Sequence, residues 1–266
     1  MGIQLIHTGE MMKILFINSN QFKQPWPILP FGLCCVSAAV KQAGHHVRIL
    51  DLCFSSDTEK DITAAVNEFD PDVVGLSIRN IDNSAGYNTE FFLDEIDANT
   101  IRPLKNIFVG PIVIGGPSVG ISGREMLEYL DLNYAIRGDG EAGMVEFLNR
   151  LESGKDLSQT PGLIIRQGGR IETENPAACV SDLDSVFSKG NIFSDIDLTP
   201  YNAFGTHLPV QTKRGCALKC TYCTYNRIEG KRFRLRDPRR IADQIETMVR
   251  NTGINKIEFT DSTFNL

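Results

Sequence analysis

The chain has 266 residues, with 27 Lys and Arg against 33 Asp and Glu, giving a formal net charge of −6. Hydrophobic residues make up 42% and charged residues 23%, which excludes a disordered or fibrous chain, and the acidic balance argues against a protein that binds nucleic acid over its whole surface. We find no run of about 18 apolar residues that could cross a membrane, and the first residues do not have the pattern of a secretory signal.

Seven cysteines in a chain of this kind favour a reducing, cytoplasmic location, so clustered thiols are considered as metal ligands before disulfides. Cys34, Cys35, Cys53 and Cys179 are scattered among apolar neighbours. Because a free cysteine behaves as a small hydrophobic residue, these four are predicted to be buried packing residues.

The first part of the chain alternates short apolar runs with helical patterns, which predicts parallel strands covered on both faces. The strands are expected at 14–18, 47–52, 73–78, 112–115 and 134–137, and the helices at 31–43, 59–69, 89–99, 124–130 and 141–151. This predicts a flavodoxin-like doubly wound parallel sheet over residues 12–154. Residues 1–11 are interpreted as an extension from a mis-assigned start codon, because Met11 and Met12 directly precede the first strand.

Small and polar residues follow four of these strands, at the edge where such sheets bind ligands. They include Ser77, Asn80, Gly115, Gly116, Gly138 and Glu141. Either the glycines simply make the turns between strands and helices, or the four loops form a binding face. A dinucleotide-binding GxGxxG motif is absent after the first strand.

Residues 155–208 read as a small hairpin and a linker. Strands at 163–166 and 171–173 flank Gly168-Gly169. The linker is expected to pack on another part of the protein through its apolar side chains, which are Val186, Phe187, Ile192, Phe193 and Tyr201.

Three cysteines, Cys216, Cys220 and Cys223, follow in a CxxxCxxC pattern. A structural zinc site needs four protein ligands, and only His207 lies nearby. The spacing also differs from that of bacterial ferredoxins. Three thiolates can hold three irons of a 4Fe-4S cluster and leave the fourth iron open for a substrate.

After the motif, Asp237 and Pro238 predict the start of a helix, and Gly253 predicts its end. Expected strands at 210–213 and 256–260 flank the motif and this helix and complete one βαβ unit. Residues 209–266 are therefore predicted to begin a second α/β domain.

The cysteine spacing, with Tyr222 just before the last cysteine, resembles the radical S-adenosylmethionine (radical SAM) superfamily. The resemblance implies that the three cysteines ligate a 4Fe-4S cluster, that S-adenosylmethionine binds the open iron, and that its cleavage gives a 5′-deoxyadenosyl radical. Tyr222 would lie beside the adenine. Asp261 and Ser262 stand where many members have Gly-Gly-Glu, so they would replace that sequence in holding the methionine amino group. The implied electron donor is reduced flavodoxin or ferredoxin, and the implied substrate is a small molecule.

The domain order resembles the cobalamin-binding radical SAM class, which includes methyltransferases and ring-forming enzymes. The implied fold is a cobalamin-binding flavodoxin-like sheet followed by the first βαβ unit of a partial (β/α)6 barrel. The six loop residues from Ser77 to Glu141 would then contact cobalamin. The DxHxxG motif that supplies an axial histidine in other cobalamin proteins is missing, and His45 and His46 are expected on the opposite edge at the surface. Cobalamin would then bind base-off.

Two alternatives stay open at this point. The chain could be a corrinoid-binding module with a vestigial barrel, or a radical SAM protein without cobalamin. Only 43 residues follow Cys223, whereas six barrel units need roughly 190, so we expect a fragment or a truncated pseudo-enzyme with exposed apolar surface. Ten Lys or Arg fall within 213–240; they either attract an anionic ligand or belong to a solvated loop.

Overall fold

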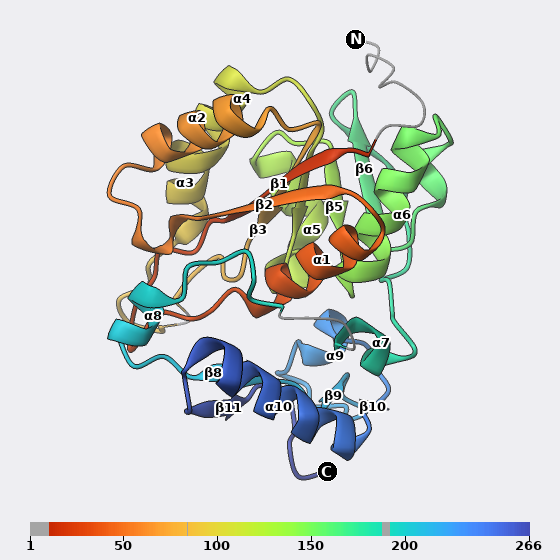
Figure 1. Cartoon of the computed structure of the whole chain (residues 1–266). Coiled ribbons are helices and arrows are strands. Elements are labelled where there is room, and N and C mark those ends of the chain that lie inside the picture. Colours follow the sequence, from red (N-terminus) through yellow and green to blue (C-terminus); the bar gives the residue numbers. More distant parts are fainter. Residues whose placement is uncertain (1–10, 84, 188–191) are drawn as a thin grey trace.

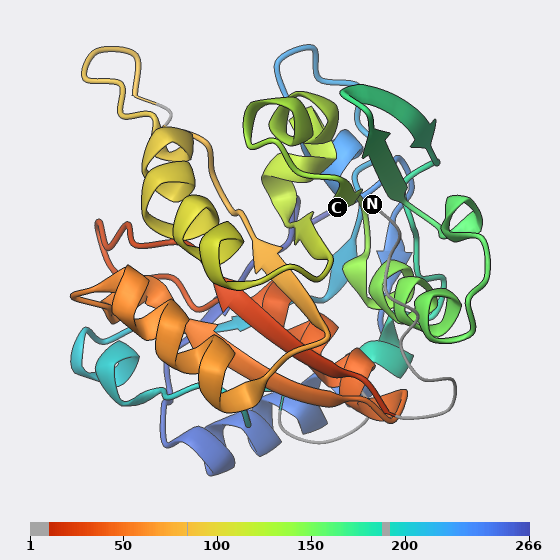
Figure 2. The same ribbon diagram turned by 90° about the horizontal axis from the view of Figure 1, so that it is seen from above.

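The computed structural model describes residues 11–83, 85–187 and 192–266, so the first ten residues of the predicted extension lie outside it. A seven-stranded sheet runs in the order β2-β1-β3-β4-β5-β6-β7 (Figures 1 and 2). Its strands are β1 (Lys13–Asn18), β2 (His46–Asp51), β3 (Val73–Ser77), β4 (Ile112–Gly115), β5 (Tyr134–Ile136), β6 (Leu163–Gln167) and β7 (Arg170–Glu174). The first five are parallel, which confirms the predicted flavodoxin-like order.

Helices cover both faces of this sheet because its strands are apolar on both sides. They are α1 (Phe31–Gln42), α2 (Thr58–Phe69), α3 (Phe92–Ile96), α4 (Arg102–Ile107), α5 (Pro117–Tyr129) and α6 (Gly140–Glu152). Helices α1 and α6 share one apolar cluster with the sheet, and α2 to α5 share the other. A turn of 3-10 helix follows β2 at Leu52–Phe54, and another precedes β6 at Leu157–Gln159.

Two helices differ from the prediction. The helix expected at 89–99 starts at Phe92, passes through a π-helical turn at Asp97–Ile101 and continues as α4. The π turn changes the hydrogen-bond spacing next to Pro103, which has no N–H to donate. The helix expected at 124–130 is the second half of α5, which begins at Pro117 and contains two glycines that weakened the helical pattern.

The predicted hairpin forms, but it also extends the sheet. Strand β6 pairs antiparallel with β5, and β7 forms the outer edge, as Figure 2 shows in dark green. The linker then crosses beneath the sheet in Figure 1 and carries α7 (Leu183–Phe187) and α8 (Thr199–Ala203). Its apolar residues pack, as predicted, in a cluster with residues of α1 and α10.

The C-terminal part contains the predicted βαβ unit, because β8 (Leu208–Val210) and β11 (Ile257–Phe259) pair in parallel around α10 (Pro238–Thr252). Asp237 caps α10 by accepting from the Arg239 N–H at 2.8 Å, and Gly253 ends it with a φ of +71°. The strand expected at 210–213 is interrupted after Val210. The chain then enters β9 (Lys213–Arg214), which pairs antiparallel with β10 (Arg234–Leu235). Helix α9 (Tyr225–Ile228) lies between them.

Apolar side chains are exposed on this part. Leu235, Phe259 and Phe264 are 70%, 43% and 57% exposed, and the last two rings stack with centroids 4.6 Å apart. In the described part of the chain, no helix has the length and apolar character needed to span a membrane.

Two burial predictions are wrong. Cys34, Cys35 and Cys53 are buried as predicted, but Cys179 is exposed because it lies in the linker after the sheet has ended. His45 was expected at the surface, yet it is only 7% exposed and its two ring nitrogens have no hydrogen-bond partner. The turn between α1 and β2 places its ring toward the interior, whereas His46 is exposed.

The linker is tied to the sheet by one buried tyrosine. The Tyr201 hydroxyl donates to Asp51 Oδ2 at 2.7 Å, and Asp51 Oδ1 accepts from Asn18 Nδ2 at 2.8 Å. Tyr201 is fully buried, and burial together with the Asp51 charge raises its pKa far above the ordinary value. This bond fixes the linker at the carboxyl ends of β1 and β2.

Tyr201→Phe should lower the free energy of unfolding by about 1.5–3 kcal/mol, because Asp51 loses a donor in a buried site. Chemical denaturation measures the change. Tyr129→Phe is the matched control, since Tyr129 also donates to an aspartate, Asp94, but is 52% exposed. The control should lose less than about 0.5 kcal/mol. Equal losses in the two variants would contradict the assignment.

Stability should also fall as the pH is lowered, because of His45. Burial lowers its pKa from 6.5 and His46 adds to this, whereas Glu152 opposes it. Below pH 6.5 the unfolded chain binds more protons at this site, so the free energy of unfolding decreases by at most about 1.4 kcal/mol per pH unit. The loss begins near the unfolded pKa and is complete below the folded pKa.

Denaturation curves between pH 5 and pH 8 test this expectation. His45→Leu should flatten the pH dependence below pH 7. His46→Gln, at the exposed neighbour, should leave it as in the unmodified chain. An identical slope with and without His45 would refute the role of its burial.

Candidate functional site

The three cysteines of the motif lie on the loop between β9 and α9. Cys216 is buried, Cys220 is exposed and Cys223 is half-buried. The Cys223 N–H donates to the Cys220 carbonyl at 3.4 Å, which folds the loop back, and Tyr222 is 89% exposed beside it. Across residues 11–83, 85–187 and 192–266, no three His, Cys, Asp or Glu side chains are close enough to hold a metal ion. The thiols therefore share one loop without converging in this structure.

The backbone immediately before Cys216 requires a glycine. Gly215 has a φ of +90°, and a Cβ at this position would lie 2.0 Å from the Arg232 carbonyl oxygen. The Cys216 N–H donates to the Gly230 carbonyl at 3.0 Å. This hydrogen bond therefore holds the backbone of the first cysteine against the segment that follows α9.

Arg214, two residues before Cys216, is buried between two carboxylates of the loop and helix that follow β5. Its guanidinium donates to both oxygens of Glu141, at 2.7 and 3.2 Å, and lies 3.2 Å from Asp139 Oδ1. All three residues are 5–6% exposed. Burial lowers the pKa of Arg214, but Glu141 and Asp139 raise it by more, so the net pKa lies above the ordinary value. A permanently charged group thus joins the sheet domain to the cysteine segment.

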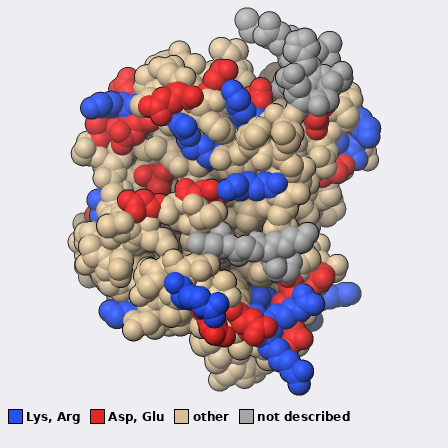
Figure 3. All heavy atoms as spheres, viewed as in Figure 1, with Lys and Arg blue, Asp and Glu red and all other residues tan. Residues whose placement is uncertain are grey.

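Two further arginines of the basic run are also paired. Arg234 donates to Asp139, and Arg236 is paired with Asp184 at 3.0 Å. Neither interpretation of the run, an anion attractor or a solvated loop, describes the buried Arg214 and Arg236 or the half-buried Arg234. These three arginines hold segments of the chain together. The exposed charges of both signs lie side by side over α10 (Figure 3).

Glu229, at the end of α9, completes this cluster of charges. Its carboxylate accepts from the Gly215 N–H at 3.1 Å and from Gln211 Nε2 at 3.2 Å. Burial raises the pKa of Glu229 and the Asp139 charge adds to this, whereas the Gly215 N–H and Arg214 lower it. The net pKa is raised, so this carboxylate takes up a proton more readily than an exposed glutamate does.

The loop after β11 packs against the segment before the motif. Asp261 accepts from the Thr212 N–H at 2.8 Å, the Thr212 hydroxyl at 2.5 Å and the Lys213 N–H at 3.2 Å. Ser262 donates to the Gly215 carbonyl at 3.2 Å. Both predicted residues therefore lie next to the motif, and Asp261 also stabilises the interrupted strand. Their contact with S-adenosylmethionine stays a prediction.

Three of the residues predicted to contact cobalamin meet at the carboxyl edge of the sheet. Ser77 is opposite Gly115 in the register of β3 and β4, and Gly116 follows directly. Gly116 has a φ of +105°, and a Cβ there would lie 2.5 Å from the Ile78 carbonyl oxygen, so the turn requires glycine. Asn80 lies half-buried in the loop after β3. The role of these residues stays a prediction.

Gly138 and Glu141 have other contacts. A Cβ on Gly138 would lie 2.3 Å from the Ala178 carbonyl oxygen, because the linker passes directly over it. Glu141 is paired with Arg214. The sequence indicated this loop but missed its partners; the available signals were two acidic residues in a short loop and the surplus of arginines before and after the motif.

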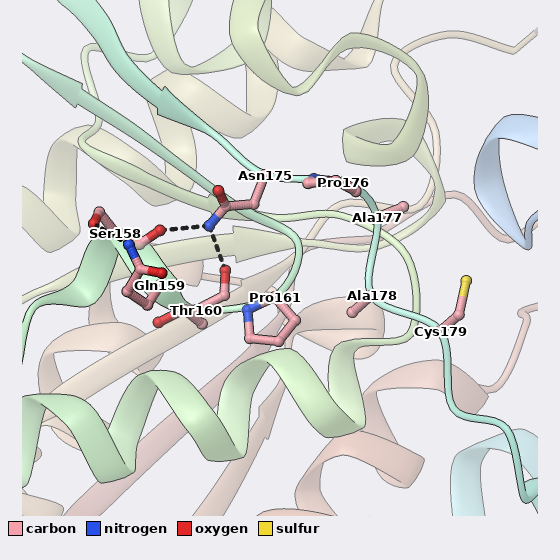
Figure 4. A pocket seen from close by; sticks show the side chains of 9 residues that line it. All are labelled: Ser158, Gln159, Thr160, Pro161, Asn175, Pro176, Ala177, Ala178 and Cys179. Carbon is pink, nitrogen blue, oxygen red and sulfur yellow. Dashed lines mark hydrogen bonds between the residues drawn. The ribbon is translucent and has the colours of Figure 1, made fainter.

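A cavity of about 390 Å³ opens beside the start of the linker (Figure 4). Asn175 is one of its lining residues and joins two segments of the lining. Its Nδ2 donates to the carbonyls of Ser158 and Thr160, both at 2.7 Å. The exposed Cys179 lies at its end, and none of the predicted site residues lines it. Its lining residues are Ser158, Gln159, Thr160, Pro161, Asn175, Pro176, Ala177, Ala178 and Cys179.

The chain is similar to one protein family and to several curated proteins. The B12 binding domain family matches residues 25–148. An uncharacterized methyltransferase, PH0819, of Pyrococcus horikoshii is 30% identical over 247 residues, which is 89% of this chain and 49% of that protein. The anaerobic magnesium-protoporphyrin IX monomethyl ester cyclase of Synechocystis is 28% identical over 260 residues, covering 94% of this chain and 49% of the cyclase. The chain thus spans about half the length of the curated relatives it matches.

Among solved structures, the radical S-adenosylmethionine methyltransferase TsrM from Kitasatospora setae matches 96% of this chain and 48% of its own. The structure with cobalamin and a [4Fe-4S] cluster bound has a TM-score of 0.85 and 24% identity. The structure with tryptophan and an S-adenosylmethionine analogue bound has a TM-score of 0.84 and 26% identity. The matched domain, the CxxxCxxC loop and the shared fold lead to one conclusion. This chain is similar over nearly its whole length to cobalamin-binding radical SAM proteins, and its residues 25–148 match the B12 binding domain.

Proposed function

We propose that Cys216, Cys220 and Cys223 bind a 4Fe-4S cluster and that S-adenosylmethionine binds the open iron. The observation that carries this proposal is the placement of three thiols on one eight-residue loop whose start is fixed by buried charges. The donor set fits the group, because three thiolates leave one iron free for a ligand. When bound, such a cluster supplies the electron that cleaves S-adenosylmethionine to methionine and a 5′-deoxyadenosyl radical.

The residues of this chain would each contribute to binding and orientation. Gly215 and its hydrogen-bonded neighbours hold the first thiol in place, and the exposed Tyr222 ring offers a flat surface for adenine. Ser262 lies next to the Gly215 carbonyl, within reach of the same ligand, and Asp261 stabilises its loop. We further propose 12–154, 155–208 and 209–266 as the corrinoid domain, the linker and the start of the radical SAM domain.

A corrinoid would bind at the carboxyl edge of the sheet, against Ser77, Gly115 and Gly116, with Asn80 beside them. Small residues at this edge let a wide planar ligand approach the backbone. The proposed reaction of the whole protein is methyl transfer or ring formation on a small molecule, because both kinds of enzyme are among the relatives. Reduced flavodoxin or ferredoxin in the cytoplasm would supply the electron.

Cys216→Ala should abolish the visible absorbance and most of the iron that the chain takes up on anaerobic reconstitution, because two thiols cannot hold the cluster. Iron analysis and absorbance spectra measure the loss. Cys179→Ala is the matched control, since Cys179 is exposed but lies outside the motif. The control should load like the unmodified chain. Zinc in place of iron, or full loading of Cys216→Ala, would reject the ligand assignment.

Gly115→Leu should weaken hydroxocobalamin binding by about tenfold or more, which corresponds to about 1.4 kcal/mol. A Cβ at Gly115 has only the Ile136 carbonyl oxygen within 4 Å, at 3.8 Å, so the backbone tolerates a side chain there, and the leucine would extend into the proposed corrinoid space. Gly86→Leu, in an open loop, is the control and should bind as before. Titration of the corrinoid spectrum gives the affinities.

Two outcomes separate the alternatives. Corrinoid binding without any iron uptake would support a carrier module with a vestigial barrel. Iron uptake without corrinoid binding in the unmodified chain would support a radical SAM protein in which the first domain has another role.

A further inference from the structure

The segment Arg214 to Cys216 is held by groups from two other segments. The Arg214 guanidinium is buried against Glu141 and Asp139 of the B12-binding domain. The Gly215 N–H donates to the Glu229 carboxylate. The Cys216 N–H donates to the carbonyl of Gly230, which follows Glu229 in the chain. The segment that carries Cys216 is therefore in contact with residues more than 70 positions earlier in the chain.

The contact at Arg214 is well suited to position the loop. A guanidinium is planar and binds a carboxylate through two parallel hydrogen bonds, which fixes direction as well as distance. Its Nε also donates to Gln211 Oε1 at 2.9 Å, so the whole side chain is engaged. Only Gly215 separates Arg214 from Cys216, and the backbone around Gly215 has little freedom because the Arg232 carbonyl lies against it.

We propose that Glu141 and Asp139, acting through Arg214, are positioning residues that hold the Cys216 thiol in its buried place. The B12-binding domain would then shape the loop that binds the cluster, whether or not a corrinoid is present. The part of this proposal that concerns the cluster rests on the proposed function; the part that concerns the thiol does not.

Alkylation of the reduced, metal-free full chain by iodoacetamide, resolved by mass spectrometry for each cysteine, tests the positioning. In the unmodified chain Cys220 and Cys179 should react quickly and Cys216 slowly, as their exposure indicates. In Glu141→Gln the Cys216 rate should rise by about tenfold or more, because loss of the charged pair lets the segment open locally. Cys34, Cys35 and Cys53 are buried in the first domain and should stay protected in both.

The matched control is Glu174→Gln. Glu174 is likewise a carboxylate paired with arginine, since it accepts from Arg137 at 2.8 Å and from Arg124 at 3.2 Å, but it lies on β7 and its side chain is 30% exposed. This variant should leave the Cys216 rate unchanged. Arg214→Lys keeps the positive charge and loses the paired geometry, so it should give a Cys216 rate between those of the unmodified chain and Glu141→Gln.

A slow Cys216 in Glu141→Gln, with Cys34, Cys35 and Cys53 protected, would overturn the proposal. If those three also become reactive, the Glu141→Gln variant has unfolded. The test then uses Arg214→Lys, in which Cys216 should react faster than in the unmodified chain while Cys34, Cys35 and Cys53 stay protected. Reconstitution with iron then distinguishes the proposed position of the Cys216 thiol from the proposed role of Glu141 in cluster binding. A chain that takes up no iron refutes the proposed function and leaves the alkylation result standing. A Glu141→Gln chain that binds iron with an unchanged electron paramagnetic resonance signal refutes the role toward the cluster.

Discussion

The contact between the sheet and the cysteine segment depends on the buried cation of Arg214. Arg214 lies between Asp139 and Glu141 with almost no contact with solvent. Removing one member of such a buried pair costs about 3–5 kcal/mol, because the charge that remains has lost its partner and cannot regain water. The two parts of the chain are thus joined through a polar contact that tolerates little displacement, in addition to the apolar cluster around the linker.

This contact also explains why the region around the motif is ordered although much of it is polar. Arg234 shares Asp139 with Arg214, and Glu229 is held by the Gly215 N–H. These charged groups therefore face an opposite charge or a hydrogen-bond donor, which offsets the cost of their burial. The cysteine loop is fixed at its first residue, while Cys220 and Tyr222 stay exposed.

Much of the first domain could be predicted from the sequence because its signals are local. Each parallel strand is a continuous apolar run, and the observed bounds differ from the predicted ones by only one residue at either end. Prediction failed where local signals conflicted. Gly120 and Gly123 hid the first half of α5, although both sit in tight packing, Gly123 with a Cβ position 2.9 Å from Ile164. The π turn before Pro103 left no pattern that differs from an ordinary helix.

The site was predictable only in part, for the same reason. The three cysteines of the motif lie within eight consecutive residues, so their spacing can be recognised from the sequence. The loop at Asp261 was identified from its place after the next predicted strand. The pairing of Glu141 with Arg214 joins residues far apart in the chain, and sequence alone does not show which carboxylate an arginine will meet. The prediction for His45 failed because a histidine in the connection between a helix and a strand has no periodic pattern from which burial can be inferred.

The outermost strand, β7, has a further consequence for how copies of this chain behave together. The free side of an edge strand exposes unpaired N–H and C=O groups, which can recruit a strand from another molecule. In β7 the exposed positions are Arg170, Glu172 and Glu174, alternating with half-buried Ile171 and Thr173. A second chain that added itself there would have to strip water from this row of ionised groups. The charged side chains of β7 thus oppose the edge-to-edge pairing of sheets from different molecules at high concentration.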